Sequence, residues 1–462
     1  MQAFSSFNVF LKAKDLAYGI INSHGKKTLT NMITAVGKQF IDWSAYYRIF
    51  SHLRIDTDKF FEIIFLMCIN LLEDQPFIVA HMDDTIIHKK GKKVAGTSWR
   101  RDPLGPPFHT NFIWGQRYIQ TSVAVPINSF IGGSRAIPIG FRHCPTAKKP
   151  SKNATQQQIQ NYKEEQKQMK LNKQGAIMIA HTRQILDNNG FSDKKLVFSV
   201  DGSYTNGTVL KSLPQNVSLV GRIRKDAKFH RLPTNQPATG RKKIYGEDLP
   251  TPEQIRQSDA FPWIKVTAWA AGKLHDFDVK VVNNIMWRKA GAKLQLKLIV
   301  IRPLGYRLTK KSRILYRQPA YLICTDEELT IQQILQSYLW RWEIEVNIGE
   351  EKSLFGVGKS HVRTLKSVES LPAFVTAIYS LLHLAEIKTK KENSISIPRP
   401  KWYPAKESKR VATGDLIINF RTQIYCRAVG LSFSHFVNNN LKTKHSKNAF
   451  KSTNINNLFC RA

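Results

Sequence analysis

Four residues in the second half of the chain combine polar or charged groups with helical spacing. Tyr338, Arg341, Glu345 and Lys352 are separated by three, four and seven residues, which places them along one side of a helix. Thr330 precedes this run and is a residue type that begins helices. Glu345 shares its side of the helix with apolar neighbours that normally pack against a core. Burying a carboxylate there is costly unless it meets a cation or a metal ion, so Glu345 is the first candidate for chemistry.

Two aspartates follow buried strands that the sequence predicts upstream. Asp84 follows the apolar run 77–82, and Asp201 follows the run 196–200. Taken singly, either acid is equally consistent with an ordinary turn at a strand end. Taken with Glu345, they would meet at one edge of an α/β sheet and repel one another unless a cation lay between them. All-oxygen ligands favour Mg²⁺ or Mn²⁺, and a carboxylate-bound pair of such ions suits phosphodiester chemistry.

The first of these positions is ambiguous, because Asp83 and Asp84 are adjacent. Neighbouring side chains on a strand point to opposite faces, so only one of the two should enter a shared site. The third position is better defined. Glu350 and Glu351 lie close to Glu345 in the sequence, but neither has its spacing to the arginine of the run.

The elements that would position these residues form an α/β pattern. A long helix, 154–189, is predicted between the third and fourth of five strands, and it begins with a polar, Gln-rich stretch. This order of strands and helices favours a mixed sheet with helices packed on it. The predicted strands are 77–82, 118–125, 136–141, 196–200 and 217–223.

Two segments depart from this pattern. Residues 1–74 have apolar residues at helical spacing in 30–40 and 60–72, which is equally consistent with a DNA-binding helix-turn-helix and a plain helical bundle. Residues 224–315 begin with Pro, Gly and basic residues and continue with alternating apolar runs, so we expect a β-rich insertion there. Three tryptophans of this insertion would either stack on DNA bases or fill a small β core: Trp263, Trp269 and Trp287.

The chain is strongly basic. Its 462 residues include 70 Lys and Arg against 34 Asp and Glu, a formal net charge of +36. An excess of this size indicates a polyanionic partner, above all nucleic acid. The alternative, that the charge only aids solubility, fits less well, because such an excess also promotes non-specific nucleic-acid binding. The hydrophobic content of 42% is ordinary and allows two or three packed domains.

Signals for export or membrane insertion are lacking. The five cysteines are far apart, odd in number and without a CxxC pair, which disfavours a zinc ribbon or a disulfide framework. The N-terminus has no secretion pattern, and the most apolar run, 60–72, is too short to cross a bilayer. We therefore expect a cytoplasmic protein with no membrane partner.

Together these motifs resemble bacterial insertion-sequence DDE transposases, which have an RNase H-like (retroviral-integrase-like) catalytic core. Asp84 within Asp-Asp-Thr, Asp201 after its strand, the basic stretch that follows Asp84 and the Thr-Gly-Asp-Leu at 413–416 are similar to one large group of them. The resemblance extends over about residues 30 to 430. The Y-x2-R-x3-E-x6-K signature of that group is matched in full by Tyr338, Arg341, Glu345 and Lys352.

The resemblance implies a fold, a cofactor and roles for the site residues. The fold would be α/β, an RNase H-like mixed sheet flanked by helices and interrupted by the β-rich insertion. Two Mg²⁺ ions would be bound, with Mn²⁺ as a substitute, and alignment on the Asp-Thr pair favours Asp84 over Asp83 as a ligand. The catalytic, metal-binding residues would be Asp84, Asp201 and Glu345. The residues that contact DNA phosphates or the terminal nucleotide would be Arg341, Lys352 and Tyr338.

The sequence patterns, together with the resemblance, predict a division of the chain into domains. The N-terminal helical part, 1–74, would bind DNA, and the catalytic core would comprise 75–223 and 316–390, on either side of the insertion. Residues 391–462 would form a basic linker, a short helix and a disordered tail that begins near 438.

The implied activity is DNA transposition. Such a transposase binds the terminal inverted repeats of its own element, cleaves the strands and joins them to target DNA, and two ends on one target imply a homodimer on paired ends. It would act in the bacterial cytoplasm, on the nucleoid. Two alternatives stay open: a site-specific RNase H-like endonuclease without strand transfer, and a DNA-binding regulator derived from a transposase.

Overall fold

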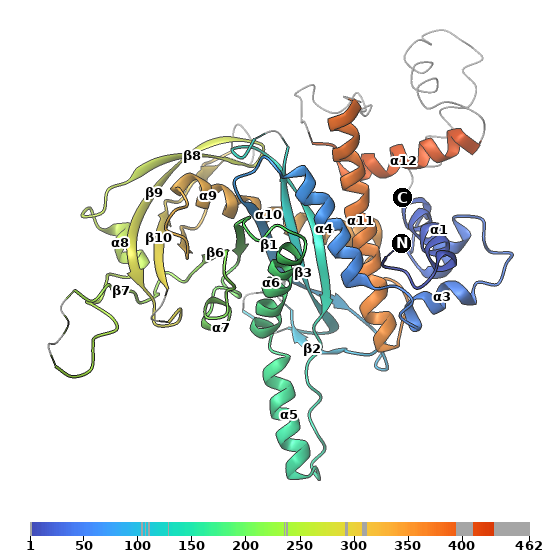
Figure 1. Cartoon of the computed structure of the whole chain (residues 1–462), viewed down its shortest axis with the longest axis horizontal. Coiled ribbons are helices and arrows are strands. Elements are labelled where there is room, and N and C mark those ends of the chain that lie inside the picture. Colours follow the sequence, from blue (N-terminus) through green and yellow to red (C-terminus); the bar gives the residue numbers. More distant parts are fainter. Residues whose placement is uncertain are drawn as a thin grey trace, which may run out of the picture.

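The computed structural model places an extended mixed sheet between layers of helices (Figure 1). It describes residues 2–428 apart from 103–104, 107, 110, 128, 235, 237–238, 292–293, 307–311 and 394–409. The predicted disordered tail and most of the predicted basic linker lie outside these described residues.

The centre of the sheet is formed by the strands predicted to carry the two aspartates. A three-stranded antiparallel meander is followed by two strands that run parallel to its first strand, in the spatial order β4-β3-β1-β5-β6. These strands are β1 (Ile78–His88), β3 (Phe112–Pro126), β4 (Ser134–His143), β5 (Leu196–Val200) and β6 (Val217–Arg222). The short β2 (Ser98–Arg101) pairs antiparallel with the start of β3. The predicted α/β fold, an RNase H-like mixed sheet flanked by helices, is confirmed.

The predicted insertion is rich in strands, and most of them continue the central sheet. Strand β13 (Ala320–Cys324) pairs with β6 on one side and with β10 of the insertion on the other, both antiparallel. The insertion strands are β7 (His230–Arg231), β8 (Ile264–Ala270), β9 (Lys273–Met286) and β10 (Gln295–Ile301), with helix α8 (Pro252–Gln257) and the separate pair β11 (Gly305–Tyr306) and β12 (Leu315–Tyr316). The site strands and the insertion are therefore parts of one hydrogen-bonded sheet.

Helices pack on both faces of the sheet. On one face lies α6 (Leu171–Asn188), where a Cβ added to Gly175 would meet the side chains of Met82 and Tyr204. The predicted long helix is in fact two helices, because the chain breaks at Lys170, whose ψ is 135°. The polar α5 (Gln156–Gln168) buries no residue and projects away from the sheet (Figure 1). The short α7 (Gly207–Leu210) follows β5.

The helices that follow the insertion, among them the predicted signature helix, pack on the opposite face and at the β4 edge. They are α9 (Ile331–Trp340), α10 (Trp342–Glu350), the π-helical turn η1 (Glu351–Phe355) and α11 (Leu365–Asn393). Helix α11 alone, among the described residues, is long and apolar enough over Leu365–Lys390 to cross a membrane, but 78% of its most apolar window is buried, as in a core helix.

The N-terminal part is helical, as predicted. It contains α1 (Phe7–Asn22), α2 (Leu29–Thr34), α3 (Ser44–Ser51) and α4 (Thr57–Leu71). The prediction of a helix over 30–40 was wrong in length, because the chain turns at Gly37 with a φ of 72°. Helix α12 (Thr413–Ala428) returns to this part, and the buried Arg421 donates to the carbonyls of Ile21 and Ser23 at 2.7 and 3.0 Å.

One buried glutamate in η1 should make the stability of the folded protein depend on pH. Glu351 in η1 is 1% exposed, and burial raises its pKa well above 4.5, which hydrogen bonds from Gln120 and Thr376 oppose only in part. The folded protein thus keeps this proton at pH values where the unfolded chain has lost it, so stability is lost as pH rises from about 5. Between about pH 5 and 8 the free energy of unfolding of the wild type should fall. We expect this fall to be about 1–3 kcal/mol smaller in Glu351→Gln, which has no proton to lose.

Urea unfolding of both proteins at the two pH values measures this difference. The matched control is Glu165→Gln on the exposed helix α5, which should follow the wild type. Parallel pH profiles for Glu351→Gln and the wild type would show that Glu351 is ionised in the folded protein.

Candidate active site at the sheet edge

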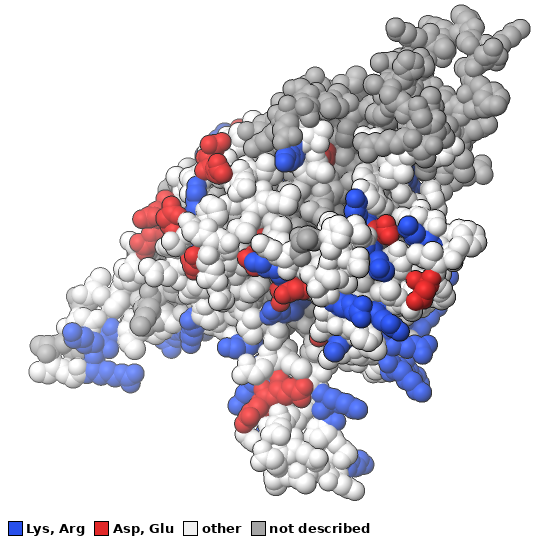
Figure 2. Space-filling model, turned by 45° about the vertical axis from the view of Figure 1, so that its right-hand side comes forward, with Lys and Arg blue, Asp and Glu red and all other residues white. Residues whose placement is uncertain are grey.

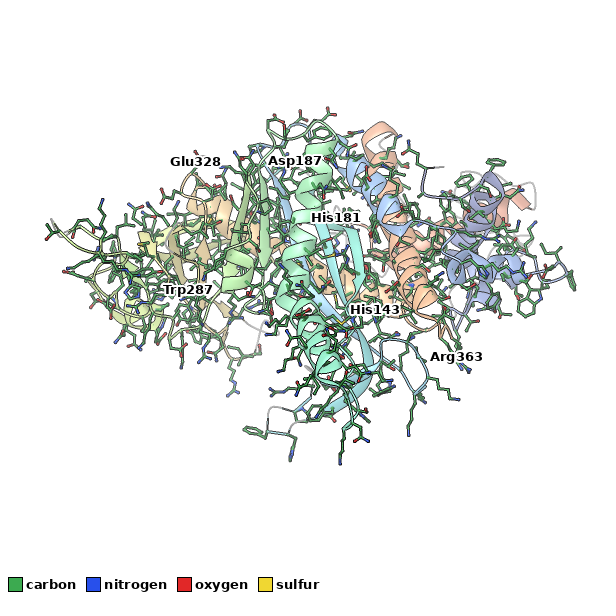
Figure 3. The ribbon with its side chains drawn as sticks, turned by 60° about the horizontal axis from the view of Figure 1, so that its bottom comes forward. His143, His181, Asp187, Trp287, Glu328 and Arg363 are labelled. Atoms are coloured by element: carbon green, nitrogen blue, oxygen red, sulfur yellow. The ribbon has the colours of Figure 1, made fainter. Side chains whose placement is uncertain are left out.

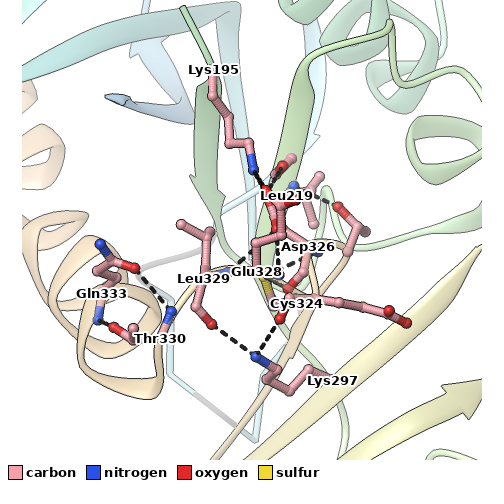
Figure 4. Close-up of polar contacts among 12 residues, drawn as sticks. Lys195, Leu219, Lys297, Cys324, Asp326, Glu328, Leu329, Thr330 and Gln333 are labelled. Atoms are coloured by element: carbon pink, nitrogen blue, oxygen red, sulfur yellow. Dashed lines mark hydrogen bonds and ion pairs between the residues drawn. The ribbon is translucent and has the colours of Figure 1, made fainter. Parts of the chain in front are cut away.

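The start of α9 is fixed by polar contacts at the end of β13 (Figure 4). The buried Asp326 accepts from Lys195 Nζ at 2.9 Å and from Ser218 Oγ at 2.8 Å, so β5, β6 and the segment after β13 are joined at one carboxylate. Lys297 of β10 donates to the carbonyl of Leu329 at 2.8 Å. Thr330 then caps the helix in a reciprocal capping box with Gln333, which confirms it as the helix start.

The predicted signature helix is interrupted where its charged residues begin. Helix α9 ends at Trp340 and α10 starts at Trp342; the turn between them is tightened at Arg341, whose amide bonds to the carbonyl of Tyr338 at 3.1 Å while its φ and ψ stay helical. Hydrogen bonds to the sheet hold both segments. Gln336 pairs with the backbone of Trp269 in β8, at 2.8 and 3.2 Å, and Asn347 donates to the carbonyl of Ala136 in β4 at 2.9 Å. The turn is therefore clamped from the insertion on one side and from the meander on the other.

The end of the signature lies against β1. Lys352 is in the π-helical turn, and its Nζ donates to the carbonyl of Ile86 at 3.1 Å. Burial lowers the pKa of this ammonium group. Lys89, at the end of β1, donates in turn to the carbonyl of Gly358, so two lysines connect this turn to the strand.

Strand register decides which aspartates share a face. In the parallel pair β1–β5, Met82 is opposite Val200, so Asp83 and Asp201 occupy the next pair of positions. Asp83 is opposite Gln120 of β3, and Gln120 contacts Glu351 in η1. Asp83 thus points toward α9, α10 and η1, and the neighbouring Asp84 points toward α6.

Asp83 is the aspartate that meets the signature helix. Its Oδ2 lies 3.7 Å from Nη1 of Arg341, and Nη2 of Arg341 donates to Oε1 of Glu345 at 2.7 Å. Burial and the nearby Asp201 raise the pKa of Asp83 to about 7, although Arg341 opposes the rise. Arg341 is therefore an internal counter-ion for two carboxylates.

Asp84 has a separate set of partners on the α6 side. Its carboxylate lies 3.2 Å from Nε of Arg117 and accepts from the hydroxyl of Tyr204 at 3.2 Å. Burial raises its pKa, and Asp201 adds to the rise while Arg117 and Tyr204 oppose it. Asp201 is thus close enough to both aspartates to disfavour their ionisation.

The remaining signature residues lie around Arg341. Its guanidinium carbon is 5.8 Å from the centre of the Tyr338 ring, and burial raises the pKa of the Tyr338 hydroxyl. The Glu345 side chain is 34% exposed, so it is half-buried rather than buried. Trp342, which continues the apolar spacing of the predicted helix, is 62% exposed and does not pack inward.

The donor chemistry of this edge fits a hard divalent cation, because oxygen ligands predominate and the clustered carboxylates disfavour one another's charge. In the described part of the chain, however, no three His, Cys, Asp or Glu residues are close enough to hold one ion. Asp83 and Glu345 are bridged by Arg341. A metal bound by acids from β1, β5 and α10 would have to displace this guanidinium from Glu345.

Comparison with known proteins identifies the family of the chain. A family model described as DDE superfamily endonuclease matches residues 4–277, which is more than half of the chain. The chain belongs to the DDE superfamily endonuclease family. No curated protein matches it.

Membership in the DDE superfamily endonuclease family sets the broad chemistry. It supports a transposase-type or nuclease-type enzyme with DNA as the substrate, and DDE endonucleases generally use divalent metal ions. The match includes Asp83, Asp84 and Asp201 and ends within β9, at residue 277. Helix α10 with Glu345 lies beyond it, so its place beside the aspartates comes from the structure.

Several residues of this edge were not predicted from the sequence. Arg117 and Tyr204 carry no motif, and their position beside Asp84 follows only from the pairing of β1 with β3 and the turn after β5. Of the three tryptophans, Trp287 is buried and packs 5.8 Å from the Phe229 ring, which fits the core interpretation. Trp263 is half-buried beneath the ammonium group of Lys280, which lies 4.5 Å from its ring centre.

Removal of the counter-ion should destabilise the site in a pH-dependent way. Arg341→Met leaves Asp83 and Glu345 without their shared cation, and we expect a loss of about 1–3 kcal/mol in the free energy of unfolding at about pH 8. The loss should be smaller near pH 5, because a protonated Asp83 needs no counter-charge. Urea unfolding at both pH values measures it. Arg224→Met, which breaks an exposed pair with Asp226, is the control and should change stability little. An equal loss at both pH values would contradict the pairing.

Proposed function

We propose that this protein is a DNA transposase that binds the terminal inverted repeats of its own element, cleaves the DNA strands and joins them to target DNA. The observation that carries the proposal is the position of the complete Tyr-Arg-Glu-Lys set, on α9, α10 and η1, against the sheet edge of Asp83, Asp84 and Asp201. The family match supports DNA as the substrate.

The proposed metal ligands are Asp201, Glu345 and one aspartate of the Asp83–Asp84 pair. Alignment of the Asp-Thr motif favours Asp84, whereas the face shared with α10 favours Asp83. Two Mg²⁺ ions, replaceable by Mn²⁺, would activate the attacking oxygen and stabilise the leaving oxygen when bound. The clustered acids support a cationic cofactor, because each nearby carboxylate increases the cost of ionising the next.

The basic signature residues would hold the DNA. Arg341 offers a planar guanidinium that can pair with a phosphate through two parallel hydrogen bonds, and Lys352 offers a point charge. Tyr338, beside Arg341, would support the terminal nucleotide. In the structure Arg341 bonds to Glu345 and Lys352 to a carbonyl of β1, so both would exchange a protein partner for a phosphate when DNA binds.

The reaction would have two steps at the same edge. Water would first attack a phosphodiester and free a 3′-hydroxyl at the element end, and that hydroxyl would then attack target DNA without ATP. Joining two ends to one target would require a homodimer on paired ends. We further propose that the protein acts in the bacterial cytoplasm. Residues 1–74 would be the DNA-binding part, and 75–223 with 316–390 would form the catalytic core.

Single carboxylate substitutions test the site. Asp201→Asn and Glu345→Gln should each lower cleavage of element-end DNA at least about 100-fold, because even partners outside the first ligand shell affect metal sites about 10–100-fold. They should keep DNA binding. Asp83→Asn and Asp84→Asn compare the two candidate metal ligands. If one of these variants still cleaves DNA, the aspartate that it replaces is not a metal ligand. Asp193→Asn, an exposed acid after α6, is the control. Thermal unfolding with and without Mg²⁺ gives a second readout, since loss of a ligand should abolish the metal-induced rise in Tm.

Strand joining separates the proposed transposase from a nuclease. Incubated with Mg²⁺, pre-cleaved element ends bearing a 3′-hydroxyl and a target plasmid, the wild-type protein should yield joined products. Cleavage of intact ends without any joined product would instead support a site-specific endonuclease. Lys352→Ala should bind pre-cleaved ends about 10-fold more weakly, because one phosphate contact is lost.

A further inference from the structure

A large cleft lies beside the candidate active site, between the core and the insertion. Its volume is about 1400 Å³, more than the ~300–1,000 Å³ typical of small-molecule sites. Gly202, which follows Asp201, lines one end of it. Other lining residues come from the segment after β6 and from the turn after β9, which contains Trp287 (labelled in Figure 3).

The lining of this cleft is strongly cationic. It contains seven Lys or Arg and three acids. Each acid has a partner inside the cleft: Asp226 bonds to Arg224 at 2.8 Å, Glu253 to Arg256 at 2.6 Å, and the Oδ1 of Asp248 to Nδ1 of His230 at 2.7 Å. Asp226 and Glu253 are therefore paired with cations, whereas Asp248 meets a neutral imidazole, because Nε2 of His230 accepts from Arg288.

Four cations remain for a ligand. In the described part of the chain, Arg222, Lys225, Lys228 and Lys289 have no carboxylate within 4.0 Å. Arg288 donates to Nε2 of His230 at 3.0 Å, and His230 connects it to the carboxylate of Asp248. The four remaining cations are exposed. Lys and Arg also gather along the lower side of the molecule in Figure 2, whereas many acids lie at the upper left.

The cleft has a fixed position relative to the candidate active site. A Cβ added to Gly207 in α7 would lie 2.5 Å from the carbonyl oxygen of Lys289, so the turn after β9 packs directly on the core. Arg222 ends β6, which is paired with β5, and β5 leads to Asp201. Both walls are thus built on strands of the sheet that carries the carboxylates.

We propose that this cleft binds the sugar-phosphate backbone of the DNA segment adjoining the bond at the active site. The inference rests on the proposed function for the statement that the bound DNA continues into the active site. The binding of a phosphate backbone is argued only from the size and charge of the cleft. A cleft larger than a small-molecule site, with four uncompensated cations from two separate segments, fits a polyanion whose charges repeat along its length. Because the contacts are to phosphates, binding is independent of base sequence.

Charge reversal tests the cleft. Lys225→Glu, Lys228→Glu and Lys289→Glu are combined in the full chain, and binding of a duplex oligonucleotide of arbitrary sequence is measured over a range of salt concentrations. We expect affinity to fall about 10–100-fold at low salt, and the slope of log K against log salt to decrease by about 3, or 0.9 per lost phosphate contact.

The control carries the same change of charge elsewhere. Lys163→Glu, Lys167→Glu and Lys173→Glu replace exposed lysines of α5 and α6, so the two variants have equal net charge. The control should bind within about 3-fold of the wild type. Equal affinities and slopes for the two triple variants would overturn the inference. Circular dichroism must show the same fold for both, and the single variant Lys289→Glu, with an expected slope change of about 0.9, serves if the triple variant fails to fold.

Failure of the cleft and failure of the proposed function are distinguishable. If the wild type cleaves and joins element ends while the cleft variant binds and reacts like the control, only the cleft inference fails. If no cleavage occurs but the cleft variant alone loses DNA affinity, the cleft inference stands and the proposed transposase activity fails.

Discussion

The organisation of this protein follows from the repulsion between carboxylates gathered at one sheet edge. Parallel pairing of β1 and β5 brings Asp83 and Asp84 next to Asp201, and partial burial strengthens their mutual effect. A fold that places three acids so close must supply positive charge. Here it does so from two sides, with Arg341 below Asp83 and Arg117 beside Asp84.

Neutral hydrogen bonds, rather than ion pairs, fix the helix that completes the edge. Gln336 and Asn347 connect α9 and α10 to strands on either side of the turn at Arg341. These amides keep their partners whatever the charge at the edge. Arg341 can therefore exchange a carboxylate for a phosphate without releasing the helices that carry it.

Local patterns in the sequence predicted most helices and strands and the four-residue signature. They did not predict which face of a strand or helix a given side chain occupies. The strand carrying Asp84, the cap at Thr330 and the four-residue spacing could be predicted, since each depends on neighbouring residues. The orientation of Asp83 depends on the register of β1 with two distant strands, and the exposure of Trp342 depends on how α10 packs against the rest of the fold. Neither has a local signal. The basic cleft joins Lys and Arg residues from segments about 60 positions apart, so its charge is visible only after folding.

The shared sheet also governs how the substrate must adapt. Five residue pairs join β10 to β13, so the insertion cannot swing away from the core without breaking a central ladder. Opening by a hinge between these two parts is therefore expensive. If a duplex meets both the cleft and the carboxylate edge, as proposed, any mismatch in shape has to be met by the DNA, and smooth bending of a 20–30 base-pair site costs roughly 1–6 kcal/mol, depending on its sequence. A rigid protein of this kind would then rank DNA ends by their flexibility, even at base pairs it never touches.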